Sequence, residues 1–576
     1  MKRSRQWIDW IFALSLAAVG VYLVIWQNSH LAVLWDLSYI LENSYRISLG
    51  QIPYHDFPFP YAPLTFLTQA ALIKLTGRVF FHHVIYCAVV NGLSIIVTWR
   101  VLLRVLKQTN HGRLLALVLT VPLTVLGIYS IFPHPFYDCD CTFAILVCLL
   151  LLLRFQDEER SFVDSFGVGA VLVIPLFIKQ NTGGAFLIAV VGCLLALFFF
   201  DVFQRRGVRK YIALFTGLLA SFSFALFLIH HFAGLQNYYQ WTIRFAAQRR
   251  TPQLAQMIGM YREAGVLWWL CPVVLGLFLS WLCRRHRAGQ WFGLVLLLVP
   301  FVWPVVYLLR DSDASERAER LVNLWPLVLV LSVVAMVLVV VRRRSFSQLL
   351  VPLIIVATAH GAFMSQQLWG STYALWPLFV ILVAFIVAAI GKAELERLSL
   401  TFVSILSLSL LIAGAFYLRS HERLEYANLD DGELTHSTNP VLHGMTTRGT
   451  WLTDFDELVA YANKNIPAED AILCLPGEDP FYYTTGRRPQ FPVVMFDHTI
   501  NPYSSQEIVD LARSRNIKWL IVKDELQLEE EPIENRDELM SLLEKEFESV
   551  DSLNNYEIYQ RKSADEKDDE SEEEPK

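Results

Sequence analysis

The stretch "LWDLSYILENSYRISLGQIPYHDFPFPYAPLT" (residues 34–65) follows the first long apolar segment of the chain. It places Asp36, Glu42 and Arg46 within a few turns of a segment that is apolar enough to cross a membrane, and Asp56 comes soon after them. What these charges do depends on the side of the membrane that they face. That side follows from the pattern of the whole chain.

The composition is that of a polytopic membrane protein. Of the 576 residues, 54% are hydrophobic, and the mean hydropathy is +0.40. Soluble domains are less apolar, and a helix needs about 20 mostly apolar residues to span a bilayer. About thirteen segments come near this length, which predicts about thirteen transmembrane helices: 7–27, 79–103, 114–132, 141–154, 165–178, 184–200, 211–233, 266–283, 291–309, 324–341, 348–366, 372–391 and 399–418.

Basic clusters predict the orientation, because lysine and arginine are enriched in cytoplasmic loops. Five clusters fall in alternate loops and indicate a cytoplasmic N-terminus: Lys2/Arg3/Arg5, Arg104/Lys107/Arg113, Arg205/Arg206/Arg209/Lys210, Arg284/Arg285/Arg287 and Arg342/Arg343/Arg344. The basic start and its apolar core, without a convincing cleavage site, predict a retained signal anchor. The run Pro63–Thr76 is short for a span and contains Lys74, so we expect a helix at the outer interface. Residues 28–78 then form a long first external loop, and the opening stretch faces the outside.

An odd number of spans also places the C-terminal region outside. Residues 427–562 predict an extracytoplasmic α/β domain, with buried strands at 471–475, 491–496 and 518–522. Between the last two strands, the capping-box pattern at Ser504 predicts a helix that runs to about Arg515.

The chain therefore divides into a transmembrane module (1–426), this external domain and a tail. Residues 563–576 are rich in acids and lack apolar anchors, which predicts disorder. The net charge of −6 mostly reflects the tail and the segment before it. Nothing in the composition indicates nucleic-acid binding.

Asp36 is the first candidate site residue. On a helix that opens near Trp35, Asp36, Tyr39, Asn43 and Arg46 fall within an arc of about 80°, and Gly50 and Pro53 end that helix. Such a face is either a solvated interfacial surface or a carboxylate held at the mouth of a membrane cavity. In a cavity, partial desolvation would raise the pKa of Asp36 and suit it to general-base work. Glu42 lies off this face and is expected to tolerate Gln.

Asp138 and Asp140 form a second acidic site, in the very short external loop before the span at 141–154. Ionisable groups at this depth are rare and usually functional, although capping of the next helix is the alternative. Lys179, in the sequence "PLFIKQNTGG", lies where a helix breaks at the external face. It either extends to the surface or binds phosphate as a point charge.

Further cations lie in the two moderate external loops, at 234–265 and 310–323. Arg249, Arg250, Arg310 and Arg320 run against the positive-inside bias, which weakly suggests that they meet an anion. Two acidic sites and several cations beside lipid suit chemistry on an amphiphile with an anionic head.

These residues resemble those of the GT-C superfamily of membrane glycosyltransferases, especially the bacterial branch with protein O-mannosyltransferases and the aminoarabinose transferase of lipid A. The shared pattern is an Asp in a long first external loop followed by "GQIPYHDFPFPYAPLT", a second acidic motif from Tyr137 to Asp140, about thirteen spans and an external α/β domain. Coverage is nearly full length, with short and degenerate motifs. The chain departs from the aminoarabinose branch at Tyr61-Ala-Pro63, where those enzymes carry Glu-Lys-Pro.

The resemblance implies an enzyme that transfers a hexosyl or pentosyl group from a polyprenyl-phosphate donor to an extracytoplasmic glycan, lipid or protein. Asp36 would be the catalytic base of an inverting transfer, with Asp138 and Asp140 as the second acidic site. Lys179 would replace the missing phosphate contact.

The remaining first-loop residues, Tyr39, Arg46, Asp56 and Tyr61, would either line the acceptor side or shape the loop. A divalent metal that bridges Asp36 and Asp138 is compatible with this arrangement. The expected location is a bacterial plasma (inner) membrane.

Two other functions compete with this reading. A polysaccharide ligase or polymerase usually depends on arginines in a large late external loop, and the loops here are only moderate. A transporter or flippase for lipid-linked sugars would carry ionisable residues in the middle of its spans, whereas these spans are nearly charge-free there.

Overall fold

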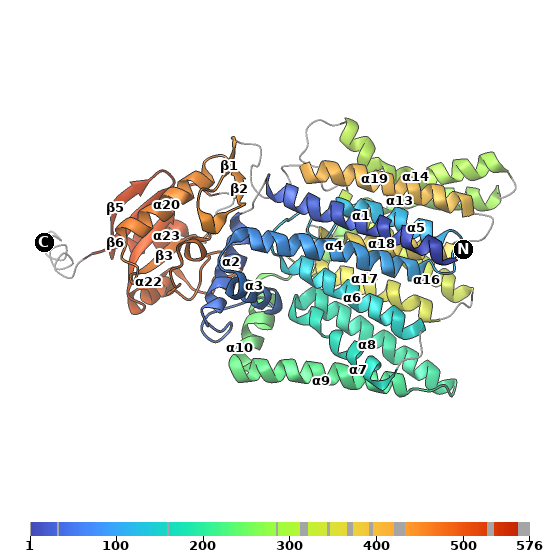
Figure 1. The fold of residues 1–576 in the computed structure, drawn as a ribbon, viewed down its shortest axis with the longest axis horizontal. Coiled ribbons are helices and arrows are strands. Elements are labelled where there is room, and N and C mark those ends of the chain that lie inside the picture. Colours follow the sequence, from blue (N-terminus) through green and yellow to red (C-terminus); the bar gives the residue numbers. More distant parts are fainter. Residues whose placement is uncertain are drawn as a thin grey trace. The chain divides into compact units, whose positions relative to one another are not determined.

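The structure is a computed structural model. It describes residues 2–30, 34–157, 161–283, 286–310, 321–342, 346–365, 372–390, 396–419, 432–526 and 535–562. The chain forms two compact units (Figure 1). The first comprises Met1–Gln27, Val84–Leu228 and Arg250–Glu425, and the second Asn28–His83, Ile229–Arg249 and Tyr426–Lys576. Residues 28–83, which include the predicted first external loop, thus belong to the same unit as the C-terminal region.

The first unit is helical. Its elements are α1 (Lys2–Asn28), α4 (Phe80–Val105), α5 (Gly112–Thr120), η1 (Val121–Thr124), α6 (Tyr137–Asp157), α7 (Phe162–Val171), η2 (Ile174–Phe177), α8 (Gln180–Phe203), α9 (Arg209–Phe232), α12 (Leu254–Glu263), α13 (Val266–Leu282), α14 (Arg287–Arg310), α16 (Leu324–Val341), η4 (Phe346–Leu349), α17 (Leu350–Phe363), α18 (Trp376–Ile390) and α19 (Glu396–Arg419). Every segment predicted as a span is at least partly helical.

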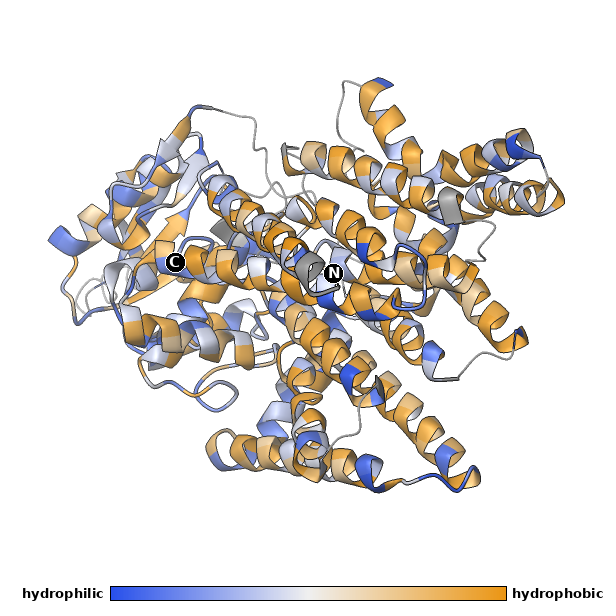
Figure 2. Cartoon of the chain, turned by 45° about the vertical axis from the view of Figure 1, so that its right-hand side comes forward, coloured by the Kyte–Doolittle hydropathy of each residue, from blue (hydrophilic) through white to orange (hydrophobic). Residues whose placement is uncertain are grey.

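Seven described helices are long and apolar enough to cross a membrane, or eight if the bent pair α12 and α13 is one span. Several other predicted spans form shorter apolar helices, among them α17 and α18. A polytopic helical membrane protein is therefore confirmed, while the count of thirteen spans stays a prediction. Figure 2 shows apolar residues along most of these helices and hydrophilic residues gathered towards many of their ends.

Glycines let some of these helices approach closely, as small residues do in membranes. A Cβ at Gly169 of α7 would lie 1.9 Å from the Leu214 carbonyl oxygen of α9, and one at Gly217 would lie 2.0 Å from that of Phe166. At Gly183, in the first turn of α8, a Cβ would lie 2.1 Å from the Pro175 oxygen of η2. This last contact brings the start of α8, and with it Lys179, against the preceding chain.

The second unit joins helices of the first external loop to an α/β fold. Its elements are α2 (Leu34–Ser48), α3 (Leu64–Thr76), α10 (Leu235–Tyr239), the π-helix η3 (Gln240–Phe245), α11 (Ala246–Arg249), β1 (Leu434–His436), η8 (Pro440–Leu442), β2 (Thr446–Arg448), α20 (Trp451–Asn465), β3 (Ala471–Leu475), α21 (Phe481–Thr485), α22 (Ser505–Ser514), β4 (Ile517–Lys523), α23 (Arg536–Leu543), β5 (Phe547–Leu553) and β6 (Tyr556–Arg561). A four-stranded sheet has the order β3-β4-β6-β5, in which only β3 and β4 are parallel.

The predicted α/β domain is confirmed, with one strand wrong. β3 and β4 match the expected strands, and α22 begins after Ser504 with the predicted capping box. Residues 491–496, predicted as a strand, are buried but form no strand. Pro492 has no N–H to donate to a sheet. The carbonyls of Phe491 and Pro492 instead accept hydrogen bonds from Arg46.

Candidate active site

The second acidic site lies in the first turn of α6. Asp138 and Asp140 are both 7% exposed there. The first N–H groups of a helix have no partner within it, and its N-terminus carries a partial positive charge, so carboxylates are stabilised at this position. This site belongs wholly to the first unit.

Lys179 is paired with Asp138. Its Nζ donates a hydrogen bond to Asp138 Oδ1, and the lysine is 7% exposed. The ammonium also lies 5.5 Å from the centre of the Tyr137 ring. Lys179 directly precedes α8, at the helix break expected from the sequence. Two residues 41 positions apart therefore form a buried ion pair.

Asp140 is held by two tyrosines that the sequence did not single out. Its Oδ1 accepts hydrogen bonds from Tyr86 (2.8 Å) on α4 and from Tyr129 (2.6 Å) after η1. Asn91, also on α4, accepts a hydrogen bond from the Tyr129 backbone N–H at 3.2 Å. α4 thus positions both hydroxyls. A tyrosine near the outer end of an apolar span is the signal that could have pointed to Tyr86.

Asp36 lies in the first turn of α2, as the sequence predicted, and is partly buried. Tyr39 and Tyr61, 5% and 8% exposed, are in contact, with ring centres 4.9 Å apart and ring planes tilted by 51°. The motif around them packs as an aromatic cluster, in which the Tyr54 hydroxyl donates to the Tyr61 carbonyl at 2.7 Å. Tyr54 adopts a φ of 69°, and its backbone N–H donates to the Phe57 carbonyl, which closes the turn.

Asp56 lies at the surface of the same loop. Its Oδ2 accepts from the Ile52 N–H at 2.7 Å, and its Oδ1 lies 2.7 Å from His55 Nδ1. Although partial burial acts the other way, these contacts with Ile52 and His55 lower the pKa of Asp56. The carboxylate therefore stabilises the turn before the aromatic cluster.

Arg46 and Glu42 have environments that sequence periodicity did not suggest. Arg46 is 2% exposed, and its guanidinium donates to Gln51 Oε1 and to the carbonyls of Phe491 and Pro492. Glu42 is 1% exposed, and its Oε1 accepts from the Tyr483 N–H at 3.0 Å. Burial raises the pKa of Glu42 to about 8. Glu42, which was expected to tolerate substitution by Gln, is therefore part of the interior. Contact between Arg46 and the sugar acceptor stays a prediction.

The external arginines are spread over the described chain. Arg249 ends α11, where it donates to the His498 carbonyl at 3.2 Å, and Arg250 follows it. Arg310 ends α14 and is exposed. Arg320 lies outside the described residues, as does the predicted acidic tail at 563–576. A role for these arginines in anion binding stays a prediction.

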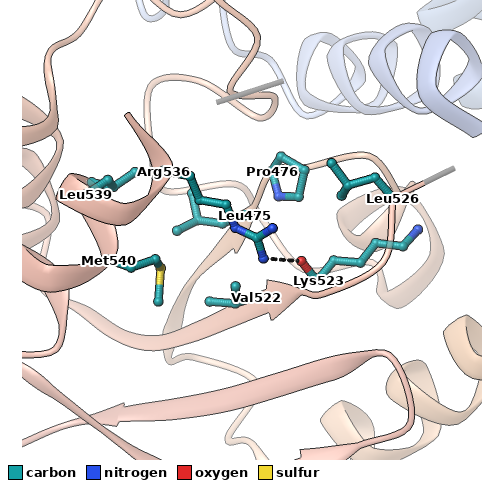
Figure 3. A pocket seen from close by; sticks show the side chains of 8 residues that line it. All are labelled: Leu475, Pro476, Val522, Lys523, Leu526, Arg536, Leu539 and Met540. Atoms are coloured by element: carbon teal, nitrogen blue, oxygen red, sulfur yellow. Dashed lines mark hydrogen bonds between the residues drawn. The ribbon is translucent and has the colours of Figure 1, made fainter. Parts of the chain in front are cut away.

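The second unit also contains a small pocket at the carboxyl ends of the parallel strands β3 and β4 (Figure 3). Its empty space is about 280 Å³, open solvent included, and its lining is mostly apolar. Arg536 donates to the Lys523 carbonyl at 3.0 Å. The Lys523 side chain extends away to Glu478 and Asp479, at 3.2 and 2.9 Å. None of the candidate carboxylates lines this pocket.

Among the described residues, no group of three or more His, Cys, Asp or Glu side chains could hold an ion. The Lys179 ammonium already supplies the positive charge beside Asp138. A metal that bridges Asp36 and Asp138 stays a prediction, and no step below depends on one.

Comparison with solved structures identifies proteins whose fold resembles that of this chain. No protein-family model and no curated protein matches the sequence. Among solved structures, the oligosaccharyltransferase of Archaeoglobus fulgidus, in complex with Zn and sulfate, is similar with a TM-score of 0.50 and 12% identity, over 93% of this chain and 71% of that one. ArnT of Cupriavidus metallidurans is similar at 12% identity over 97% of this chain and 98% of that one, with TM-scores of 0.46 bound to undecaprenyl phosphate and 0.44 in the apo state. The likeness to the oligosaccharyltransferase shows that this chain shares the fold of that structure, in agreement with the fold expected from the sequence resemblance.

Proposed function

We propose that this chain is a membrane glycosyltransferase that moves a sugar from a polyprenyl-phosphate donor to an acceptor outside a bacterial plasma membrane. The buried pair of Lys179 and Asp138 carries the proposal. Burying two charges costs several kcal/mol per ion before their attraction repays it. A buried ion pair at the start of α6, in a chain with the GT-C fold, supports a site that binds a charged substrate.

Lys179 is the proposed partner of the donor phosphate. Its ammonium has three N–H donors, and Asp138 engages one of them through Oδ1. The others can bind phosphate oxygens while the polyprenyl tail stays in lipid. As the sugar leaves, negative charge builds on the phosphate, and a fixed cation stabilises that charge. Arg249, Arg250, Arg310 and Arg320 would add to the attraction for the anionic donor.

Asp36 is the proposed base. The acceptor hydroxyl loses its proton to the Asp36 carboxylate, its oxygen bonds to the anomeric carbon, and the bond from that carbon to the phosphate oxygen breaks. The donor leaves as polyprenyl phosphate. Attack opposite the leaving group inverts the anomeric carbon, and a positioned base contributes about 10²–10⁴-fold to such a step. Tyr39 and Tyr61 would line the acceptor side.

Asp140 is proposed to orient the reacting groups. Two tyrosine hydroxyls on one carboxylate oxygen fix its direction. The two acidic sites then have different tasks: Asp140 orients the reacting groups, and Asp36 accepts a proton.

A transfer assay in membranes tests the proposal. Membranes that contain the chain are supplied with undecaprenyl phosphate carrying a radiolabelled glucose, mannose, galactose or aminoarabinose. We expect label from one donor to move into an envelope glycan, glycolipid or protein. Cells with and without the gene should differ in the same product. Absence of transfer from the whole panel, together with an unchanged envelope profile, would refute the function.

The orientation can be tested separately in spheroplasts. External protease should cut within residues 427–576 and leave the loop at 284–290 intact. Protection of the C-terminal domain would contradict both the topology and an extracytoplasmic reaction.

A further inference from the structure

The C-terminal domain and the helix that carries Asp36 are joined within the second unit by hydrogen bonds that span more than 400 residues of sequence. Tyr45 on α2 donates to the Gly486 carbonyl at 2.7 Å, and Arg46 donates to Pro492 at 2.8 Å. Glu42 accepts from the Tyr483 N–H at 3.0 Å. All three contacts on the domain side are backbone groups, so the attachment depends on the path of the chain there.

Arg78, just before α4, completes the attachment from a second direction. Its Nη1 donates to the Tyr483 carbonyl at 2.7 Å, and its guanidinium lies 5.4 Å from the centre of the Tyr45 ring. Gly486, with a φ of +79°, ends α21, and a Cβ there would lie 2.6 Å from the Arg78 guanidinium. The short helix α21 is thus bound both by α2 and by Arg78, which contact each other through the Tyr45 ring.

The domain side of this attachment is itself rigidly built. Lys523, in the central strand β4, is 2% exposed and binds Glu478 at 3.2 Å and Asp479 at 2.9 Å. Although burial favours the neutral amine, these two carboxylates raise the pKa of Lys523. The Tyr556 hydroxyl donates to the second Asp479 oxygen at 2.8 Å. The loop that leads into α21 is therefore tied to the sheet through buried charges.

The geometry of α2 separates the attachment from Asp36. With about 100° per residue, Ser38, Glu42, Tyr45 and Arg46 define one face, and Asp36 lies about 130° from its centre. The anchors begin only two residues after Asp36, since the Ser38 hydroxyl lies 3.4 Å from the Gly477 carbonyl oxygen. A helix held along one face fixes the direction of a side chain on another.

We propose that residues 477–492 of the C-terminal domain position the Asp36 helix, with Arg46 and Glu42 as positioning residues. This rests on the proposed function, in which Asp36 is the base. The domain is then a working part of the active site, and its backbone sets where the carboxylate meets the acceptor. Misplacement of a catalytic group by about 1 Å can cost about 10²-fold in rate, so such control is large enough to matter.

The test uses the full chain in lipid nanodiscs and two variants on opposite sides of the attachment. Arg46→Met keeps the apolar stem but loses the donors, and Gly486→Ala introduces the clash with Arg78. Both should speed amide hydrogen exchange in residues 36–48 by about tenfold or more, because local opening becomes easier. Both should lower kcat for transfer from the active undecaprenyl-phosphate sugar about 10-fold to 100-fold, with the donor KM little changed.

Two controls make the result decisive. Ser48→Ala removes a hydrogen bond within α2 (2.6 Å, to the Tyr45 carbonyl) and should alter neither readout. Arg46→Lys, which restores a charge and a donor, should recover part of kcat. Exchange in β4 reports whether a variant is folded. Faster exchange in α2 with a wild-type kcat would overturn the positioning role, as would unchanged exchange in both variants. Wild-type transfer by Asp36→Asn would instead refute the proposed base, whatever the exchange shows.

Discussion

The two helices that carry the candidate carboxylates place them alike and hold them differently. Asp36 lies in the first turn of α2, and Asp138 and Asp140 lie in the first turn of α6. On α6 the carboxylates themselves make the contacts, with a lysine and two tyrosine hydroxyls. Helix α2 is itself held to the C-terminal region through Ser38, Tyr45 and other residues C-terminal to Asp36, whose partners in that region are backbone groups.

This difference bears on chemistry. Two tyrosine hydroxyls fix the direction of the Asp140 carboxylate, which suits it to orienting the reacting groups. On α2, the anchors fix the helix, and with it the position of the proposed base, Asp36. The following changes test this division of tasks.

The largest effect is expected at Asp36. Asp36→Asn keeps the size and one oxygen acceptor but cannot take a proton, so transfer should fall by about 10²-fold or more. Asp164→Asn is the matched control, since Asp164 also lies in the first turn of a helix and is exposed. It should transfer normally. Initial rates in membranes, normalised to the amount of chain, give the comparison. A near-normal rate for Asp36→Asn would move the base to α6.

The next effect is expected at Lys179, measured as binding of undecaprenyl phosphate to the purified chain. Lys179→Met alone leaves the Asp138 carboxylate buried without its partner, which costs about 3–5 kcal/mol of stability. Combined with Asp138→Asn, it should fold again yet bind the lipid phosphate about tenfold more weakly, roughly the value of one hydrogen bond to a charged group.

Asp138→Asn alone keeps the ammonium and an oxygen that can still accept its hydrogen bond, so it should keep binding. Lys210→Met, at the start of α9, controls for loss of a lysine. If the double variant bound undecaprenyl phosphate as well as Asp138→Asn does, Lys179 would serve only the ion pair.

Sequence patterns predicted what is local in these two sites. Apolar segments gave the helices of the first unit, the capping box gave α22, and a break in apolarity gave the position of Lys179. The partners were not predictable, because they are distant along the chain. Tyr86 reaches Asp140 across 54 residues, and Arg46 reaches Pro492 across 446.

Periodicity also placed Arg46 on the same helix face as Asp36. It did not predict the burial of Arg46, because an arc on a helical wheel cannot distinguish a residue that faces solvent from one that faces another segment. The same limit explains residues 491–496. Their apolar run correctly predicted burial, but burial alone does not decide between a strand and an irregular segment whose carbonyls are bound by a side chain.

A smaller effect is expected from Tyr86→Phe, which removes one of the two hydroxyls on Asp140. If Asp140 must be held in one direction, losing one hydrogen bond to its carboxylate should lower the rate of sugar transfer about tenfold. Tyr211→Phe removes an equivalent bond to Asp201 (2.9 Å) elsewhere in the same unit and should leave transfer unchanged. Equal rates for the two variants would mean that the tyrosines only fill space around α6.

The smallest effect concerns pH and the anchor of α2. The pKa of Glu42 is raised from 4.5 to about 8 by burial, against the opposing effects of the Tyr483 and Tyr482 N–H groups and of Arg46 and Arg78. Between these two values the folded chain binds a proton that the unfolded chain releases, so this contribution to stability is full below about 4.5 and is lost as the pH rises through 8.

Glu42→Gln keeps the acceptor for the Tyr483 N–H but cannot ionise, so it should lose less stability than the wild type between pH 6 and pH 9. Each kcal/mol corresponds to about 2–4 °C in the unfolding temperature of a unit of this size. Hydrogen exchange in α2 should follow the same trend, whereas exchange in α6, whose carboxylates are bound by Lys179 and tyrosines, should not differ between Glu42→Gln and the wild type. An equal decline for both proteins would show that Glu42 is ionised in the folded chain, and that α2, like α6, is held by charge.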